Sequence, residues 1–185
     1  MSPLTRQKYI VIGGPGTGKT TLGSRLSVKT GIPFTDLDAL FWTPGWGKRP
    51  REEFIDCVRE LSAQPSWVMA GNYLSRIAPH LWPQADAIVW LDLPRRISFS
   101  RLLRRTLRQA RRREELFPGC PQSLRAALRD GLFRTGWREP RQLRETVDRR
   151  CAELGVPRSK ITRLRHPRAV EAWFKQEVEA DSHGQ

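Results

Sequence analysis

The segment GGPGTGKT, residues 13–20, contains the residue types needed to hold the phosphates of a nucleotide. It fits the pattern G-x-x-x-x-G-K-[ST] and lies between an apolar β-rich run and a helical stretch. Glycines let backbone N–H groups approach phosphate oxygens, and the N-terminus of a helix favours an anion. The predicted contacts are Gly13, Gly14, Pro15, Gly16, Thr17, Gly18, Lys19, Thr20 and Thr21. The alternative is a glycine-rich turn without chemistry.

Two side chains of this phosphate loop have more specific expected roles. Lys19 is expected to reach the β- and γ-phosphates, where its charge would be catalytic, and Thr20 to offer a hydroxyl to Mg²⁺. Such a loop indicates ATP or GTP, and the base-reading pattern N-K-x-D of GTPases is absent from the sequence. We therefore expect ATP and Mg²⁺ as cofactors.

Two acidic residues, Asp36 and Asp38, lie at the end of the next predicted strand, IPFTDLD. Alternation along an extended segment places both carboxylates on the same side. Phosphoryl transfer mainly needs a metal, positioning and a group that orients the attacking oxygen. We predict that Asp36 helps to hold the metal and that Asp38 orients the acceptor or acts as its base. Alternatively, Asp38 caps a helix that begins at Ala39, and the two roles are compatible.

An aromatic segment with several helix-breaking residues follows these acids. Phe41, Trp42 and Trp46 are interspersed with threonine, proline and glycine, and basic residues come directly after them. An aromatic wall with a basic rim suits a planar or phosphorylated acceptor, so the three aromatic residues are predicted acceptor contacts. The alternative is that they belong to the hydrophobic core, as aromatic residues commonly do.

Residues 95–113 contain nine arginines and no acidic residue. At 100° per residue, one helix face would carry Arg101, Arg105, Arg108 and Arg112, and the opposite face Phe99, Leu103, Leu107 and Ala110. Like charges on one face repel each other unless an anion lies nearby. This pattern predicts phosphate binding by the arginine face, with a merely solvated basic helix as the alternative.

The whole chain of 185 residues is strongly basic, with 33 Lys and Arg against 19 Asp and Glu and a net charge of +14. Such a charge attracts nucleotides, nucleic acids and acidic partners. The three cysteines fit no zinc or CxxC spacing, and no apolar run is long enough to span a membrane. We expect a cytoplasmic protein without a secretion signal or membrane partner, and the oligomeric state is left open.

Predicted strands alternate with predicted helices along the chain. The β-rich runs are residues 8–14, 32–38, 66–71, 85–94 and 159–164, and helical patterns fill much of the chain between and after them. This alternation predicts an α/β fold with a mostly parallel sheet of five strands.

Five segments, in this order, resemble the bacterial DNA topology modulation proteins, which are P-loop proteins related to adenylate kinases. The segments are GGPGTGKTTL, LDALFWTPGW, VMAGNY, VWLDLPR and GCP. The resemblance implies an NMP-kinase-like P-loop fold with sheet order 2-3-1-4-5. It also implies a single domain over residues 1–185, with a helical arginine-rich lid inserted at about 95–140 and an acceptor site that faces the phosphate loop.

Resemblances also suggest roles for single residues. The pattern F-x-D-x-D that ends at Asp38 is similar to that of shikimate and gluconate kinases, where the first acid helps to hold hydrated Mg²⁺ and the second touches the acceptor hydroxyl. By position in the related kinases, Arg101 would stack on adenine, Arg105 would contact phosphates, and His166 would lie beside the adenine. Further lid contacts could come from Arg134, Arg138 and Arg141.

The third predicted strand departs from the adenylate-kinase pattern. Ala70 precedes Gly71 where those enzymes carry an aspartate, so more of the metal-binding role would fall on Asp36. Asp92, at the end of the strand VWLDLP, is a second, lower-ranked candidate for supporting the metal. The predicted acceptor contacts on the third segment are Gly71, Asn72 and Tyr73.

These observations favour an ATP- and Mg²⁺-dependent kinase that acts on a small-molecule or nucleotide acceptor. Lys19, Asp38 and Arg105 are its predicted catalytic residues. The alternative is a nucleic-acid-associated NTPase or DNA-binding topology modulator, which the charge and the family resemblance suggest. Phosphoryl transfer to a nucleic-acid end would combine the two.

Overall fold

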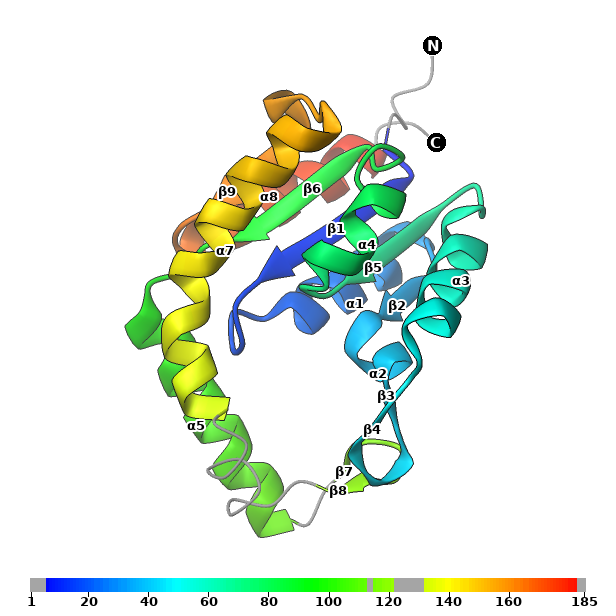
Figure 1. Ribbon diagram of the computed structural model, residues 1–185. Helices are drawn as coiled ribbons and strands as arrows, with labels where there is room; N and C mark the ends of the chain where they lie inside the picture. The colour runs from blue at the N-terminus through cyan, green and yellow to red at the C-terminus, as the bar shows by residue number, and fades with distance from the viewer. Residues whose placement is uncertain (1–5, 113–114, 122–131, 183–185) are drawn as a thin grey trace.

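The computed structural model describes residues 6–112, 115–121 and 132–182, without the side chains of residues 112, 132–142 and 180–182. Its centre is a parallel sheet of five strands (Figure 1). The strands are β1 (Lys8–Gly13), β2 (Phe34–Asp36), β5 (Trp67–Ala70), β6 (Ala87–Leu91) and β9 (Ile161–Leu164). Their spatial order is β2-β5-β1-β6-β9, which is 2-3-1-4-5 when the five are numbered along the chain. The predicted sheet is confirmed.

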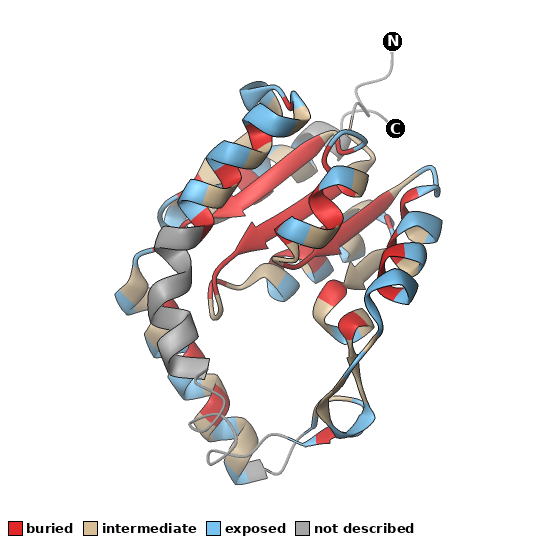
Figure 2. Ribbon diagram, viewed as in Figure 1, coloured by how far each residue is buried: buried red, intermediate tan, exposed pale blue. Residues whose placement is uncertain are grey.

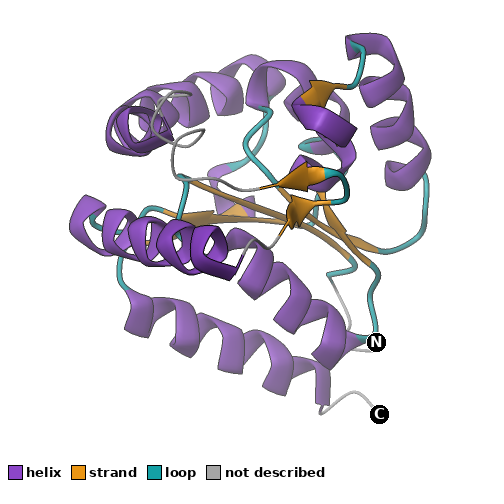
Figure 3. Ribbon diagram, turned by 90° about the horizontal axis from the view of Figure 1, so that it is seen from below, coloured by secondary structure: helices purple, strands orange, loops and turns teal. Residues whose placement is uncertain are grey.

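Helices cover both faces of this sheet, as the view from below shows (Figure 3). On one face, α1 (Lys19–Thr30) and α8 (Pro167–Ser182) enclose one hydrophobic cluster. On the other, α2 (Leu37–Phe41), α3 (Arg51–Ser62), α4 (Leu74–Leu81) and α7 (Leu132–Leu154) enclose a larger one. A short 3-10 turn, η2 (Arg158–Lys160), precedes β9. The three central strands, β5, β1 and β6, are almost entirely buried, which explains their continuous apolar sequences (Figure 2).

The carboxyl ends of the strands bring the candidate residues together. Val11 of β1 pairs with Ala70 of β5 and with Val89 of β6, so neighbouring strands end at the same edge of the sheet. The loops that follow begin there, and ligands of open parallel sheets bind at such an edge. The fold therefore places the phosphate loop, the two acids and the segment after β5 side by side.

Two hairpin-containing excursions extend from this edge. The first, which we call the aromatic hairpin, comprises β3 (Trp42–Thr43), η1 (Pro44–Trp46) and β4 (Gly47–Lys48). The second, which we call the arm, comprises α5 (Arg95–Arg112), β7 (Glu115–Phe117), β8 (Cys120–Pro121) and the N-terminal half of α7. Figure 1 shows β7 and β8 beside the aromatic hairpin, so the two excursions meet away from the sheet.

The packing of α5 differs from the predicted apolar face. Its buried residues are Ser98, Leu102 and Thr106, whereas Leu103 is 37% exposed. The reason is that α5 lies against the phosphate loop, where Ser98 and Leu102 face Gly16. On α7, by contrast, Leu143, Val147 and Cys151 recur at helical spacing and are buried.

No helix within the described ranges is both long and apolar enough to cross a membrane. The three cysteines are free thiols.

Candidate active site

The phosphate loop runs from the end of β1 to the start of α1. Gly16 and Gly18 adopt positive φ angles of 77° and 96°, which side-chain-bearing residues rarely adopt. A Cβ on Gly16 would also collide with the carbonyl of Ser98 at the start of α5. Because the cap residue Gly18 has no side chain, no side-chain hydrogen bond caps the first turn of α1. The N–H groups of that turn are thus suited to phosphate oxygens.

Lys19 lies folded along this loop. Its Nζ donates to the carbonyl oxygens of Gly13 at 2.8 Å and Gly14 at 3.3 Å. The buried hydroxyl of Thr17 donates to the same Gly14 oxygen at 2.7 Å, which holds the loop in a tight turn. The ammonium group is therefore already placed at the loop, with partners that an incoming phosphate can replace.

Thr20 and Asp36 form the part of the site that could support a metal. The hydroxyl of Thr20 donates to Asp36 Oδ2 at 2.9 Å, and Asp36 Oδ1 accepts from the backbone N–H of Asp38 at 2.9 Å. Burial raises the pKa of Asp36, as does the charge of Asp38, while the hydrogen bonds and Lys19 act in the opposite direction. A nearby divalent cation would favour the ionised carboxylate.

This donor set suits Mg²⁺ better than a metal held by protein ligands alone. Among the described residues, no three His, Cys, Asp or Glu side chains cluster closely enough to hold a metal ion. Magnesium commonly keeps several waters and binds through one or two carboxylates together with substrate phosphates. One carboxylate and one hydroxyl beside a phosphate loop fit that mode.

The interpretation of Asp38 as a helix cap is wrong. Helix α2 begins at Leu37, and its N-cap is Asp36, whose side chain accepts the hydrogen bond from Asp38 N–H. Asp36 thus has a structural contact in addition to its contact with Thr20. The side chain of Asp38 therefore does not cap α2.

Asp38 faces two groups from other elements. The hydroxyl of Tyr73 hydrogen-bonds to its side chain, and burial together with the charge of Asp38 raises the pKa of Tyr73. Burial lowers the pKa of the Arg105 guanidinium, an effect opposed by the attraction of Asp38 and Asp36. Arg105 Nε is buried and has no hydrogen-bond partner among the described residues. The arm therefore directs a cation toward the two acids.

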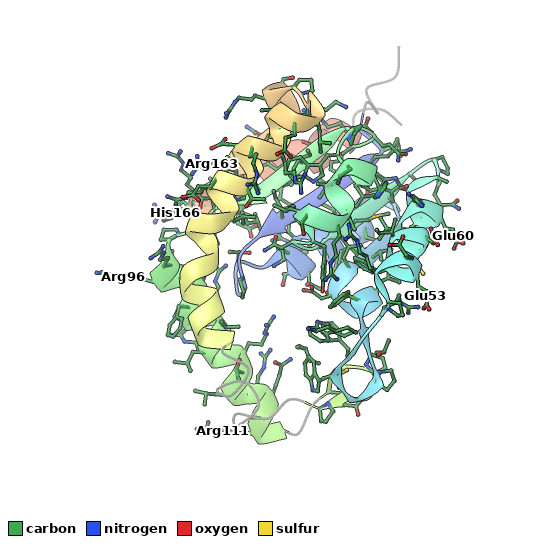
Figure 4. The ribbon with its side chains drawn as sticks, in the orientation of Figure 1. Glu53, Glu60, Arg96, Arg111, Arg163 and His166 are labelled. Carbon is green, nitrogen blue, oxygen red and sulfur yellow. The ribbon has the colours of Figure 1, made fainter. Side chains whose placement is uncertain are left out.

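A cavity of about 870 Å³ lies between the phosphate loop, α5 and α8. Its lining includes Gly16, Thr17, Gly18 and Thr21 from the loop and first turn, and Arg101, Arg105 and Arg108 from α5. These arginines share the cavity side of the helix, as their spacing predicted. The side chains of Arg112, Arg134, Arg138 and Arg141 lie outside the described residues. By contrast, Arg96 and Arg111 are exposed and extend outward from α5 (Figure 4).

His166 has a local role at the start of α8. Its Nδ1 accepts the backbone N–H of Arg168 at 3.1 Å, and the cavity wall comes instead from Pro167 and Arg168. Arg25 and Lys175 also line the cavity, and Arg25 pairs with Glu171 at 2.6 Å. Sequence reasoning missed these residues, because isolated basic residues on amphipathic helices carry no motif.

The carboxylate of Asp92 forms ion pairs with two arginines. Arg144 donates to its Oδ1 at 3.1 and 3.2 Å, and Arg163 donates to its Oδ2 at 2.6 and 2.9 Å. The carboxylate is buried, and Arg163, labelled in Figure 4, also lies over the ring of Trp90 at 4.3 Å. Both oxygens of Asp92 are thus occupied by arginines, whereas Asp36 accepts from Thr20 beside the phosphate loop.

The segment after β5 packs against the phosphate loop and α2. Asn72 binds the backbone of Gly13 through both ends of its amide, at 2.9 and 2.6 Å. Gly71 is buried, and a Cβ there would come within 2.8 Å of Leu37 Cβ. The ring of Tyr73 packs against Phe41 and Phe54. Of the three predicted acceptor contacts on this segment, Tyr73 approaches the candidate acceptor residue Asp38.

The aromatic residues divide between core and hairpin. Phe41 is buried in the core, whereas Trp42 and Trp46 are half-buried and form an edge-to-face pair at 5.4 Å. Trp46 Nε1 donates to the carbonyl oxygen of Pro121 at 3.1 Å, and the N–H of Gly45 donates to the carbonyl oxygen of Gly119 at 2.7 Å. These contacts join the aromatic hairpin to the tip of the arm.

Comparison with solved structures identifies the fold. The chain superposes on a shikimate kinase from Acinetobacter baumannii in complex with shikimate, with a TM-score of 0.58 and 17% identity over 98% of this chain and 96% of that one. A gluconokinase from Sinorhizobium meliloti 1021 gives a TM-score of 0.53, with 17% identity over 96% and 93% of the two chains. A shikimate kinase from Bacteroides thetaiotaomicron gives 0.53, with 16% identity over 95% and 98%. The chain has the P-loop kinase fold.

No protein-family model and no curated protein sequence matches the chain. The resemblance to DNA topology modulation proteins therefore has no support beyond the sequence segments that suggested it. At these identities the structural likeness is a likeness of fold, and the chemistry must be argued from the side chains described above.

Proposed function

We propose that this protein is an ATP- and Mg²⁺-dependent kinase that phosphorylates a hydroxyl of a small-molecule or nucleotide acceptor. The observation that carries the proposal is the Thr20–Asp36 hydrogen bond at the N-terminus of α1, directly beside Lys19. It combines a phosphate loop with a metal-supporting pair inside a P-loop kinase fold.

The nucleotide would lie between the phosphate loop and the cavity. The loop N–H groups and Lys19 would bind the phosphates, and the adenosine would occupy the cavity beside Arg101, Pro167 and Arg168. Thr20 and Asp36 would hold Mg²⁺, which when bound neutralises phosphate charge and orients the γ-phosphate. Asp36 would serve through one carboxylate oxygen while the other keeps capping α2.

Asp38 and Arg105 would act on the transferring group. The acceptor hydroxyl would donate its proton to Asp38 as its oxygen forms a bond to the γ-phosphorus and the bond to the ADP oxygen breaks. Tyr73 would orient Asp38 through their hydrogen bond. The cations of Lys19 and Arg105 would stabilise the charge on the transferring phosphoryl group.

The arm would act as a lid over this site, within a single domain. Its tip contacts the aromatic hairpin through Trp46 and Gly45, so that the acceptor side is bordered by both excursions. Such enclosure excludes water from phosphoryl transfer and favours a compact acceptor. The kinases that share the fold, named for shikimate and gluconate, are consistent with a small-molecule acceptor.

The net charge of +14 supports a second candidate, a nucleic-acid-associated NTPase or topology modulator. Several α5 arginines line the nucleotide cavity, however, and so have a use that requires no nucleic acid. A cytoplasmic location remains a prediction in either case.

The decisive experiment incubates the purified protein with ATP, Mg²⁺ and one candidate acceptor class at a time. The classes are sugar acids, cyclic polyols, nucleosides, nucleoside monophosphates and oligonucleotide ends. We expect ADP release that depends on one of the small-molecule or nucleotide classes, with a phosphorylated product visible by mass spectrometry. ADP release that only duplex DNA stimulates, without a phosphorylated product, would contradict the kinase proposal.

A further inference from the structure

Asn72 holds both backbone groups of the first residue of the phosphate loop. Its Oδ1 accepts the N–H of Gly13 at 2.9 Å, and its Nδ2 donates to the Gly13 carbonyl at 2.6 Å. A backbone N–H can only donate and a carbonyl can only accept, so the pairing fixes the orientation of the amide. An ionised carboxylate can only accept and an ammonium group can only donate, so neither could make both bonds at neutral pH.

The strand register explains why Asn72 reaches Gly13. Val11 of β1 pairs with Ala70 of β5. Gly13, the last residue of β1, lies two positions after Val11, and Asn72, just past the end of β5, lies two positions after Ala70. Gly13 is itself confined, because a Cβ there would lie 2.7 Å from the Leu91 carbonyl oxygen and 2.8 Å from Thr17 Oγ1. Asn72 thus joins the end of β5 to a loop residue that has little room to move.

The Gly13 carbonyl is shared between two donors. Besides Asn72, it accepts Lys19 Nζ at 2.8 Å. A nucleotide phosphate that drew the ammonium group away would leave this carbonyl without a partner if Lys19 were its only donor. A buried polar group without a partner is costly. With Asn72 in place, the carbonyl stays satisfied when Lys19 leaves.

We propose that Asn72 is a positioning residue of the phosphate loop, which fixes Gly13 and thereby lets Lys19 exchange its carbonyl partner for the nucleotide. The inference rests on the proposed function and deepens it. It replaces the sequence-based prediction that Asn72 contacts the acceptor, and the two roles predict different kinetic effects.

The test measures ATP affinity in the absence of acceptor by titration calorimetry, then KM for ATP and for acceptor separately. Asn72→Ala is expected to weaken ATP binding by roughly ten-fold, the effect of losing one or two hydrogen bonds at a buried group. KM for ATP should rise in parallel, and KM for acceptor should stay unchanged. Gln84→Ala is the matched control, because Gln84 also donates its amide to a backbone carbonyl, that of His80, but away from the loop.

Asn72→Asp supplies a readout that a purely structural role would not give. When ionised, the new carboxylate can still accept from Gly13 N–H but repels the Gly13 carbonyl. When protonated, its hydroxyl can donate again. We compare the ATP affinity of this variant with that of wild type at the same pH. The variant's relative affinity should recover as the pH is lowered from 8 to 5.

Three outcomes overturn the inference, and they are distinguishable. Normal ATP affinity with a raised acceptor KM in folded Asn72→Ala would make Asn72 an acceptor contact. A lowered melting temperature with unchanged affinity in both variants would make it a structural residue only. Failure of the wild-type protein to bind ATP would overturn the proposed function, and this inference with it.

Discussion

Thr20 and Asp36 lie 2.9 Å apart, hydroxyl to carboxylate, although they belong to different elements, α1 and the end of β2. The hydrogen bond brings a hydroxyl from the phosphate loop and a carboxylate from the edge strand β2 to one point. An Mg²⁺ ion that bound there would take one ligand from each side and its remaining ligands from water and phosphate.

Replacing the carboxylate of Asp36 should weaken the response to the metal. Asp36→Asn keeps an oxygen that can cap α2 but removes the negative charge beside Thr20. We expect the Mg²⁺ concentration for half-maximal turnover to rise on the order of ten-fold or more, as is typical when a residue that supports a metal is lost. Asp56→Asn, an exposed change on α3, is the control. Equal Mg²⁺ requirements for both variants would exclude Asp36 from the metal site.

The same substitution should stabilise the metal-free protein. The pKa of Asp36 is raised, chiefly by burial, so the ionised form costs free energy of folding above that pKa. Stability from this group is therefore greatest at low pH and falls as the pH rises from the ordinary aspartate value through the raised one. In thermal melts with EDTA, Asp36→Asn should melt slightly above wild type at pH 7, and the difference should narrow as the pH is lowered. A variant that melts below wild type at pH 7 would show that the carboxylate's hydrogen bonds outweigh its burial.

Removing the charge of Lys19 should reduce turnover far more than stability. Lys19→Met loses the contacts with the Gly13 and Gly14 carbonyls, and it loses a cation where phosphoryl charge develops. We expect turnover to fall by a factor on the order of 10²–10⁴. The control is Lys29→Met, which lies in the exposed last turn of the same helix. A folded Lys19→Met with wild-type turnover would remove the kinase proposal.

The contact between arm and aromatic hairpin should matter for the acceptor rather than for ATP. Trp46→Phe keeps an aromatic ring against Trp42 but removes the Nε1–H that reaches the Pro121 carbonyl. If the arm is a lid, acceptor KM should rise several-fold while ATP affinity stays unchanged. A change in ATP affinity with an unchanged acceptor KM would show that this contact does not serve the acceptor.

The parts of this protein that local sequence dictates could be predicted. Apolar strands, the glycine pattern at residues 13–20 and the 3.6-residue spacing of arginines each follow from backbone geometry. The sheet order came from the family resemblance and not from local sequence, and the structure has that order. What local sequence could not give were pairings between distant residues. The bonds of Asn72 with Gly13, and of Asp92 with Arg144 and Arg163, join elements 50 or more positions apart.

The errors in local detail have a similar cause. The buried side of α5 was misassigned because hydrophobicity predicts the side that faces a core, whereas α5 packs the side of Ser98 and Leu102 against Gly16 of the phosphate loop. Asp38 was considered as a helix cap because an aspartate at either position could cap. The structure uses Asp36 instead, two positions earlier, because β2 ends at Asp36 and α2 begins directly after it.

Arg105 provides the test that separates a kinase from a nucleic-acid-binding protein. Its guanidinium is substantially buried and attracted by Asp36 and Asp38, whereas Arg111 on the same helix is exposed. In a kinase, Arg105→Ala should reduce turnover by a factor on the order of 10², as for the loss of one preorganised donor to a developing charge. Arg111→Ala should have almost no effect on turnover.

A DNA-binding surface predicts the opposite pattern. Each neutralised phosphate would contribute about 0.9 to the slope of log affinity against log salt, so exposed Arg96 and Arg111 would contribute as much as Arg105 or more. We expect duplex DNA to bind weakly at physiological salt and to leave ATP turnover unchanged, because the buried guanidinium faces the phosphate loop and not the outer surface. The measurement is a salt titration of DNA binding for wild type and the three alanine variants, beside an ATPase assay with and without DNA. Tight binding weakened equally by all three substitutions, together with DNA-stimulated hydrolysis, would show that the arginines of α5 serve nucleic acid and that the kinase proposal is wrong.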